Sequence, residues 1–188
     1  MKHKLKVVVF SLLLITLMLA CSLSTETATP GSSSTDSSNN PTSAGAPNWG
    51  HPTKTSGCKA VGVLPDPACT PGDILPAATK AKICVSGYSS SVRDVPESEK
   101  QAVYAEYGIK TRTSGQYEVD HFVSLELGGS NDISNLWPEP ASPAPGFHEK
   151  DKVENYLHDQ VCSGAMTLKD AQIKIATNWL DVYNSISK

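Results

Sequence analysis

Two ionisable side chains stand next to each other in the stretch YEVDHFVSLELGGSNDISNLWPEP, residues 117–140. Asp120 offers carboxylate oxygens that suit a hard cation, and His121 offers an imidazole that suits a general base near neutral pH. The apolar alternation around them predicts a strand, and neighbouring residues of a strand point to opposite faces. Asp120 and His121 are therefore candidates for two separate tasks at one site.

Further polar residues that could complete this site follow along the chain. Asn135 lies in a loop after Gly128 and Gly129, and His148 stands where the next helix is expected to begin. Cations that could neutralise a phosphate next to the site are Arg112, Lys150 and Lys152.

Hydrophobic periodicity predicts the elements that must position these side chains. Residues 117–127 are predicted to form two strands separated by a turn or bulge, and residues 82–87 a short strand. Pro96 and the acids after it begin a helix that stops at Gly108. The segment before these elements, residues 58–79, is rich in Pro and Gly and is expected to be irregular.

Two longer helices are expected after the Pro-rich loop of residues 138–145. Apolar residues recur every four positions over residues 149–161. A cap signal at Thr167 and Asp170 opens the last helix. The fold class is therefore α+β, with strands, a loop and a helix in succession around the site.

The N-terminus predicts export. A basic start is followed by an apolar run, Val7 to Leu19, that is short for a membrane span and ends just before Cys21. Residues 1–21 resemble a lipoprotein signal peptide with lipidation of Cys21; a plain secretory signal is the alternative. Residues 22–57 are dominated by Ser, Thr and Pro and are expected to form a disordered tether, which leaves residues 58–188 as one domain.

Export changes the expectation for the remaining cysteines, which are Cys58, Cys69, Cys84 and Cys162. Two disulfides are expected in an oxidising compartment. Three pairings are possible, and we prefer Cys58 with Cys69 and Cys84 with Cys162. A zinc site is the competing interpretation, but no two of these cysteines have CxxC spacing.

The charge balance excludes a generally basic nucleic-acid-binding surface. Three of the sixteen basic residues belong to the leader, so the rest of the chain carries thirteen against nineteen acids, a formal net charge of −6. Sequence-independent binding to nucleic acid usually rests on a basic face. Any surface that binds phosphate must therefore be local.

From Asp120 to Leu136 the sequence resembles the HNH nucleases with a ββα-metal fold. That family combines Asp-His, a Gly-Gly turn, Asn-Leu and a His or Asn leading into a helix, and this chain has DHFVSLELGGSNDISNL and later FHEKDK. Its segments LPDPACTPG, ICVSGY, NLWPEP and KDKVENYLH are also similar to small exported bacterial HNH-like proteins. That likeness covers nearly all of residues 62–182.

The resemblance implies a ββα-metal core with additional helices and an irregular, disulfide-pinned N-terminal segment. Asp120 and His148 would bind a divalent cation (Mg, Mn, Ni or Zn), and His121 would be the general base. Asn135 would orient the imidazole or hold the loop. The implied activity is metal-dependent endonuclease cleavage of nucleic acid, DNA above all, outside the cytoplasm. The implied partners are this substrate and, through the lipid on Cys21, a membrane, with no obligate protein partner.

Departures from the family pattern leave alternatives open. The gap from Asn135 to His148 is long and rich in proline, so other oxygen donors could replace His148; these are Glu139, Asp151 and Glu154. His158 is expected on a helix surface or in packing, and Trp137 in the core, with base stacking as its alternative. A rival function is a non-catalytic surface-anchored binding module that keeps the HNH-like scaffold.

Overall fold

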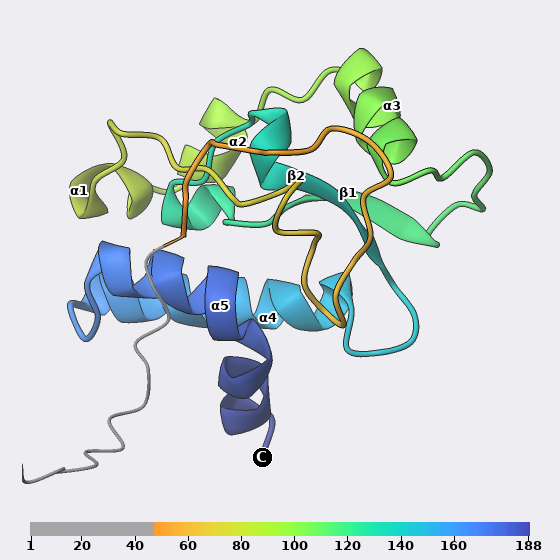
Figure 1. Cartoon of the computed structure of the whole chain (residues 1–188). Helices are drawn as coiled ribbons and strands as arrows, with labels where there is room; N and C mark the ends of the chain where they lie inside the picture. The colour runs from red at the N-terminus through yellow and green to blue at the C-terminus, as the bar shows by residue number, and fades with distance from the viewer. Residues whose placement is uncertain (1–46) are drawn as a thin grey trace, which may run out of the picture. The chain divides into compact units, whose positions relative to one another are not determined.

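The computed structural model describes residues 47–188 of the chain (Figure 1). The expected signal peptide, the lipidation site Cys21 and most of the expected tether lie outside the described residues. No helix of residues 47–188 is long and apolar enough to cross a membrane.

Residues 49–54, which were expected in the tether, are packed against the domain. Gly50 N–H donates to the Gly72 carbonyl at 2.8 Å, and Lys54 pairs with Asp66 at 2.9 Å. Trp49 packs against the hydrophobic core. The expected boundary at residue 57 therefore lies too far along the chain.

The described part combines helices with one small sheet. In chain order its elements are α1 (Lys80–Ile83), α2 (Tyr88–Val92), α3 (Glu97–Glu106), β1 (Tyr117–His121), the 3₁₀ turns η1 (Leu125–Leu127) and η2 (Ile133–Asn135), β2 (Leu136–Pro140), α4 (Phe147–Ser163) and α5 (Leu168–Ile186). The sheet has two antiparallel strands, β1 and β2. The expected α+β class is confirmed at this level.

The partner of β1 is not the strand that the sequence predicted. Residues after Phe122 turn into η1, and the second strand is β2, from the segment predicted as a Pro-rich loop. Phe122 N–H donates to the Asn135 carbonyl, so Pro138 and Pro140 occupy the positions whose N–H groups would point away from β1. Because proline lacks only that outward donor, it is tolerated on this edge strand.

Two antiparallel helices cover one side of this ribbon. α4 and α5 pack side by side (Figure 1), and the predicted stripe of Val153, Leu157 and Val161 on α4 is completely buried. Gly146 N–H donates to the Glu149 carboxylate at 3.0 Å and so caps the start of α4. The helices predicted from periodicity are thus confirmed, with α4 slightly longer than expected.

The strand predicted for residues 82–87 is wrong. This segment ends α1 and turns at Gly87, which has a φ of 80°, into α2. Ile83 is buried, whereas Val85 is 61 % exposed. A short apolar run fits a helical turn as well as a strand, and only the core contact of Ile83 distinguishes them.

Both disulfides have the preferred pairing. Cys58 is bonded to Cys69 within the irregular segment, and Cys84 is bonded to Cys162. The second bond joins the end of α1 to α4. Disulfides form and persist in oxidising environments, so they indicate an extracytoplasmic location.

Candidate functional site

Asp120 and His121 project from opposite faces of β1. Asp120 lies opposite Trp137 in the antiparallel register. His121 lies opposite Leu136. Directly opposed side chains share a face, and Glu139, two positions beyond Trp137, shares the Asp120 face. The two neighbours therefore enter different environments, as strand geometry predicts.

The side-chain amide of Asn131 holds the His121 ring. Asn131 Oδ1 lies 3.1 Å from His121 Nε2, and Asn131 Nδ2 donates to the Val92 carbonyl at 2.7 Å. The Asp94 backbone N–H donates to the same Oδ1 at 3.2 Å. These contacts orient the amide so that its oxygen, which can only accept a hydrogen bond, faces the ring. His121 Nε2 must therefore be the donor and carry the proton. In the neutral ring, Nδ1 keeps the lone pair that a general base needs.

The surroundings of His121 keep its imidazole neutral. The residue is only 3 % exposed. Burial lowers the pKa of His121 below its ordinary value, and the positive charges of Arg93 and Lys150 lower it further. The contact with Asn131 and the negative charge of Asp120 oppose this change without reversing it. At neutral pH the ring is therefore able to accept a proton.

Asn135 belongs to the loop scaffold between β1 and β2. It is completely buried, and its Oδ1 accepts from the backbone N–H groups of Val123 at 2.8 Å and Asp73 at 3.2 Å. Its Nδ2 donates to the carbonyls of Val123 and Ser130. Within residues 47–188, all four side-chain hydrogen bonds go to backbone groups. Of the two roles expected for Asn135, it therefore has the loop-holding one, and the imidazole is oriented by Asn131.

The Gly-Gly pair serves the same scaffold. A Cβ on Gly129 would lie 1.8 Å from the Val123 carbonyl oxygen. Gly128 has a φ of 76°, and a Cβ there would lie 2.4 Å from that of Ala78. Both positions require glycine because backbone and side chain approach too closely for any larger residue. The GG…N part of the motif thus builds the loop, whereas Asp120 and His121 carry the ionisable groups.

On the other face of β1, Asp120 meets the ammonium of Lys150. Lys150 is 1 % exposed, and its Nζ donates to Asp120 Oδ2 at 2.6 Å and to the His121 carbonyl at 2.9 Å. Its third contact is Glu154 Oε1 at 2.5 Å. Three protons meet three acceptors, so the ammonium is saturated. Lys150 was expected to contact a substrate phosphate; its burial within the protein makes that expectation wrong.

Charge stabilises the pair of Asp120 and Lys150. Burial by itself would raise the pKa of Asp120, but the Lys150 ammonium outweighs it and the pKa lies below its ordinary value. Burial would lower the pKa of Lys150, yet the carboxylates around it hold that pKa above its usual range. Both groups are therefore charged at neutral pH.

Two further carboxyl groups complete this cluster. Burial raises the pKa of Glu154 to about 7, although Lys150 opposes the change. The Ser124 hydroxyl donates to Glu154 Oε2 at 2.7 Å. Burial raises the pKa of Glu139 to about 10, so this residue holds a proton at neutral pH. Glu139 also interacts with the Asp120 carboxylate, which lowers the pKa of Asp120 and raises that of Glu139.

The expected cation site of Asp120 and His148 is not assembled. His148 is exposed at the start of α4, where its ring packs at a tilt against Phe147 with centroids 4.1 Å apart. In the part of the chain that the structure describes, Asp120 belongs to no group of three ligands within reach of one ion. The residues beside Asp120 do not fit a divalent cation as they stand, because Lys150 already contacts its carboxylate.

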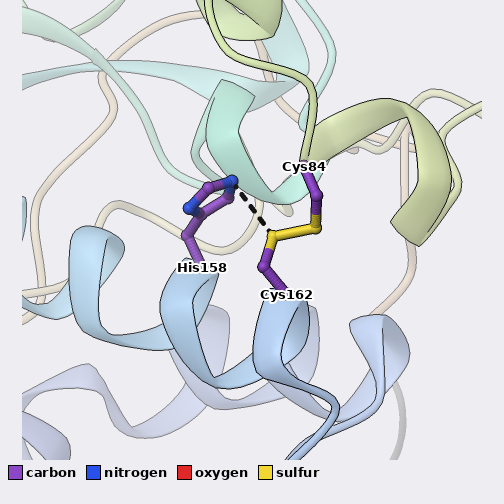
Figure 2. A group of neighbouring side chains, drawn as sticks. All are labelled: Cys84, His158 and Cys162. Carbon is purple, nitrogen blue, oxygen red and sulfur yellow. Dashed lines mark hydrogen bonds between the residues drawn. A yellow bond between two sulfur atoms is a disulfide. The ribbon is translucent and has the colours of Figure 1, made fainter.

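A different group of potential ligands lies at the Cys84–Cys162 disulfide (Figure 2). The ligand atoms of Cys84, His158 and Cys162 lie within 4.8 Å of one another, a group that could bind a metal ion. His158 Nε2 is 3.5 Å from Cys162 Sγ and 3.1 Å from the Ile83 carbonyl oxygen. Because the two sulfurs are bonded to each other, they lack the thiolate charge that binds metal. As an oxidised pair, this group is a cross-link with a packed histidine.

Arg112 and Lys152, the other two residues expected to bind a substrate phosphate, do not contact His121 among the described interactions. Arg112 lies over the ring of Tyr104, 3.6 Å from its centroid. Lys152 is exposed on α4, 3.8 Å from Glu149 and 5.8 Å from the ring centroid of Tyr183. Both side chains are exposed. Tyr104 lines a surface pocket beside β1, so Arg112 lies next to that pocket, whereas the contacts of Lys152 are with α4 and α5.

A surface pocket of about 300 Å³ lies between β1 and α3. Its walls include Arg93, Lys100, Glu118 and Val119. Val119 shares the His121 face of the strand, and Arg93 is close enough for its charge to lower the pKa of His121. Of the two cations in the pocket, Arg93 is therefore the one whose charge reaches the candidate base.

Sequence reasoning did not assign roles to Asn131 and Arg93. The one signal for Asn131 was its place as a polar residue two positions after Gly129. Trp137 is 1 % exposed within the hydrophobic core, which confirms the core interpretation over base stacking.

Comparisons with known proteins add no relative: no family model, curated protein or solved structure matches the chain.

Proposed function

We propose that the protein is an HNH-type phosphodiesterase that cleaves nucleic acid, DNA above all, outside the cytoplasm. The observation that carries the proposal is the contact between Asn131 and His121 Nε2, which leaves Nδ1 as the proton acceptor. Arg93, whose charge lowers the pKa of His121, lines a pocket beside β1. A neutral, oriented imidazole is the group that general-base catalysis requires. The succession of β1, β2 and α4 supports the HNH interpretation, because it repeats the element order of a ββα core.

In this scheme His121 Nδ1 takes a proton from a water molecule. The oxygen of that water attacks phosphorus, and the bond to the leaving ester oxygen breaks. The leaving oxygen takes a proton from solvent, and the other product carries a terminal phosphate. Arg93 and Lys100 bind the non-bridging oxygens and the flanking phosphate in the pocket. No step uses a divalent cation, because the ligand pair expected for one, Asp120 and His148, is not assembled.

Export belongs to the same proposal. The two disulfides agree with an oxidising, extracytoplasmic environment. The lipid on Cys21 would hold the enzyme at a membrane surface, with the following Ser- and Thr-rich segment as spacer. The substrate is then nucleic acid outside the cytoplasm.

Nicking of supercoiled plasmid by the purified full chain tests the proposal. His121→Ala should lower the rate by ~10²–10⁴-fold, the usual contribution of a general base. His148→Ala is the matched control, because His148 is exposed and should be dispensable. Circular dichroism melts must show that both variants fold. Equal rates for wild type and His121→Ala would sink the proposal.

A second candidate is a non-catalytic, surface-anchored binding module. The 3 % exposure of His121 and the saturation of Lys150 favour it, because a buried base and a neutralised carboxylate suit a stable scaffold. This candidate predicts a folded wild type that leaves plasmid, single-stranded DNA and RNA intact with and without divalent cations.

A further inference from the structure

The Asp120 face of β1 already contains a cation, the ammonium of Lys150. Its Nζ lies 2.6 Å from Asp120 Oδ2 and 2.5 Å from Glu154 Oε1. The lysine comes from the first turns of α4 and the aspartate from β1, so the ion pair joins the two elements. A positive centre among oxygen donors between a strand and a helix is the arrangement in which the HNH resemblance implies a metal ion.

A divalent cation and this ammonium exclude each other. A metal on the same oxygen of Asp120 would lie within a few ångströms of Nζ, and like charges repel strongly in a buried site. Lys150 is 1 % exposed, so moving it aside would leave a buried ammonium without its carboxylate partners.

We infer that Lys150 takes the place of the divalent cation, so the cluster of Asp120, Glu139 and Glu154 binds no metal ion while Lys150 is present. The inference rests on the proposed function as an HNH-type protein, and it states which cation the Asp120 face of β1 holds. It also changes the expectation for cofactors, because an HNH-type site with an internal ammonium does not depend on Mg²⁺ or Mn²⁺ at Asp120.

Binding of Mn²⁺ to the full chain, followed by the electron paramagnetic resonance signal of free Mn²⁺, tests the inference. Wild type and Asp120→Asn should bind Mn²⁺ equally, because Asp120 contributes no metal site. Lys150→Met, which keeps most of the length of the side chain without its charge, should gain a site at least about tenfold tighter than any in wild type. Adding Asp120→Asn to Lys150→Met should remove that gain.

Tight Mn²⁺ binding in wild type that Asp120→Asn abolishes would overturn the inference. This comparison does not require Lys150→Met to fold, so a poorly folding variant leaves the test decisive.

Plasmid cleavage in EDTA separates the inference from the proposed function. Cleavage that persists in EDTA supports both. Cleavage that EDTA and Asp120→Asn abolish together contradicts the inference and the metal-free step, while the protein remains a phosphodiesterase. An inert wild type removes the proposed function, while the Mn²⁺ measurement still decides the inference.

Discussion

Asn131 Oδ1 and His121 Nε2 lie 3.1 Å apart, across the loop that joins β1 to β2. The Val92 carbonyl and the Asp94 N–H hold the other positions of the amide, so the imidazole meets a fixed acceptor. This contact selects the tautomer with Nδ1 unprotonated. Asn131 is therefore the positioning residue of the proposed base.

Asn131→Ala should lower plasmid cleavage by about 10- to 100-fold, the effect of removing a partner that orients a histidine. Asn131→Asp keeps an acceptor for Nε2 and should retain more activity. Its negative charge should also raise the pKa of His121 and move the acid limb of the pH–rate profile to higher pH. Unchanged rates and profiles in both variants would show that Asn131 does not act through His121.

Glu139 should make the protein less stable as pH rises. Its pKa is 4.5 in the unfolded chain and about 10 when folded, so the folded state holds an extra proton between these values. The stabilisation is complete below pH 4.5 and is lost toward pH 10, at about 1.4 kcal/mol per pH unit where the difference is one proton. Urea unfolding from pH 5 to pH 9 should show a flatter dependence for Glu139→Gln. The exposed Glu97→Gln is the control, and parallel curves for wild type and Glu139→Gln would contradict the prediction.

The two disulfides should contribute unequally to stability. Cys84–Cys162 closes a separation of 78 residues and Cys58–Cys69 one of 11. In the chain-entropy model, their removal as paired Ser variants costs ~4.5 and ~2.8 kcal/mol. Urea unfolding of the two paired variants measures the difference. A larger loss from the short loop would show that native contacts, rather than loop entropy, dominate.

The group of Cys84, His158 and Cys162 should bind metal only after reduction. An added dithiol reductant breaks the Sγ–Sγ bond of Cys84 and Cys162 and is itself oxidised to a disulfide. The two cysteine thiols that result release their protons when a metal binds. Co²⁺ should therefore give thiolate absorption bands with the reduced chain and none with the oxidised chain. His158→Ala should weaken the binding, whereas Cys58→Ser with Cys69→Ser should leave it intact. Bands that disappear only in the latter variant would assign the metal to the other pair.

The longer helices were predictable from the sequence. Of the two strands of the sheet, β1 was predicted and β2 was not. The stripe of α4 and the cap of α5 are local patterns, since each depends on residues within a few turns of one helix. β2 was missed because Pro138 and Pro140 argue against a strand when read locally. They are compatible with β2 only because their missing N–H groups fall on its unpaired edge, which is a property of the pairing with β1.

The sequence by itself determined that Asp120 and His121 occupy opposite faces of one strand, because alternation is a local property of extended backbone. It also indicated the turn at Gly128 and Gly129 and the presence of two disulfides. Only the tertiary structure decided which partner each face meets. Asn131 rather than Asn135 reaches the imidazole, and Lys150 rather than a metal between Asp120 and His148 neutralises the carboxylate. These partners depend on how the loop and α4 pack against β1, and residue spacing does not encode that packing.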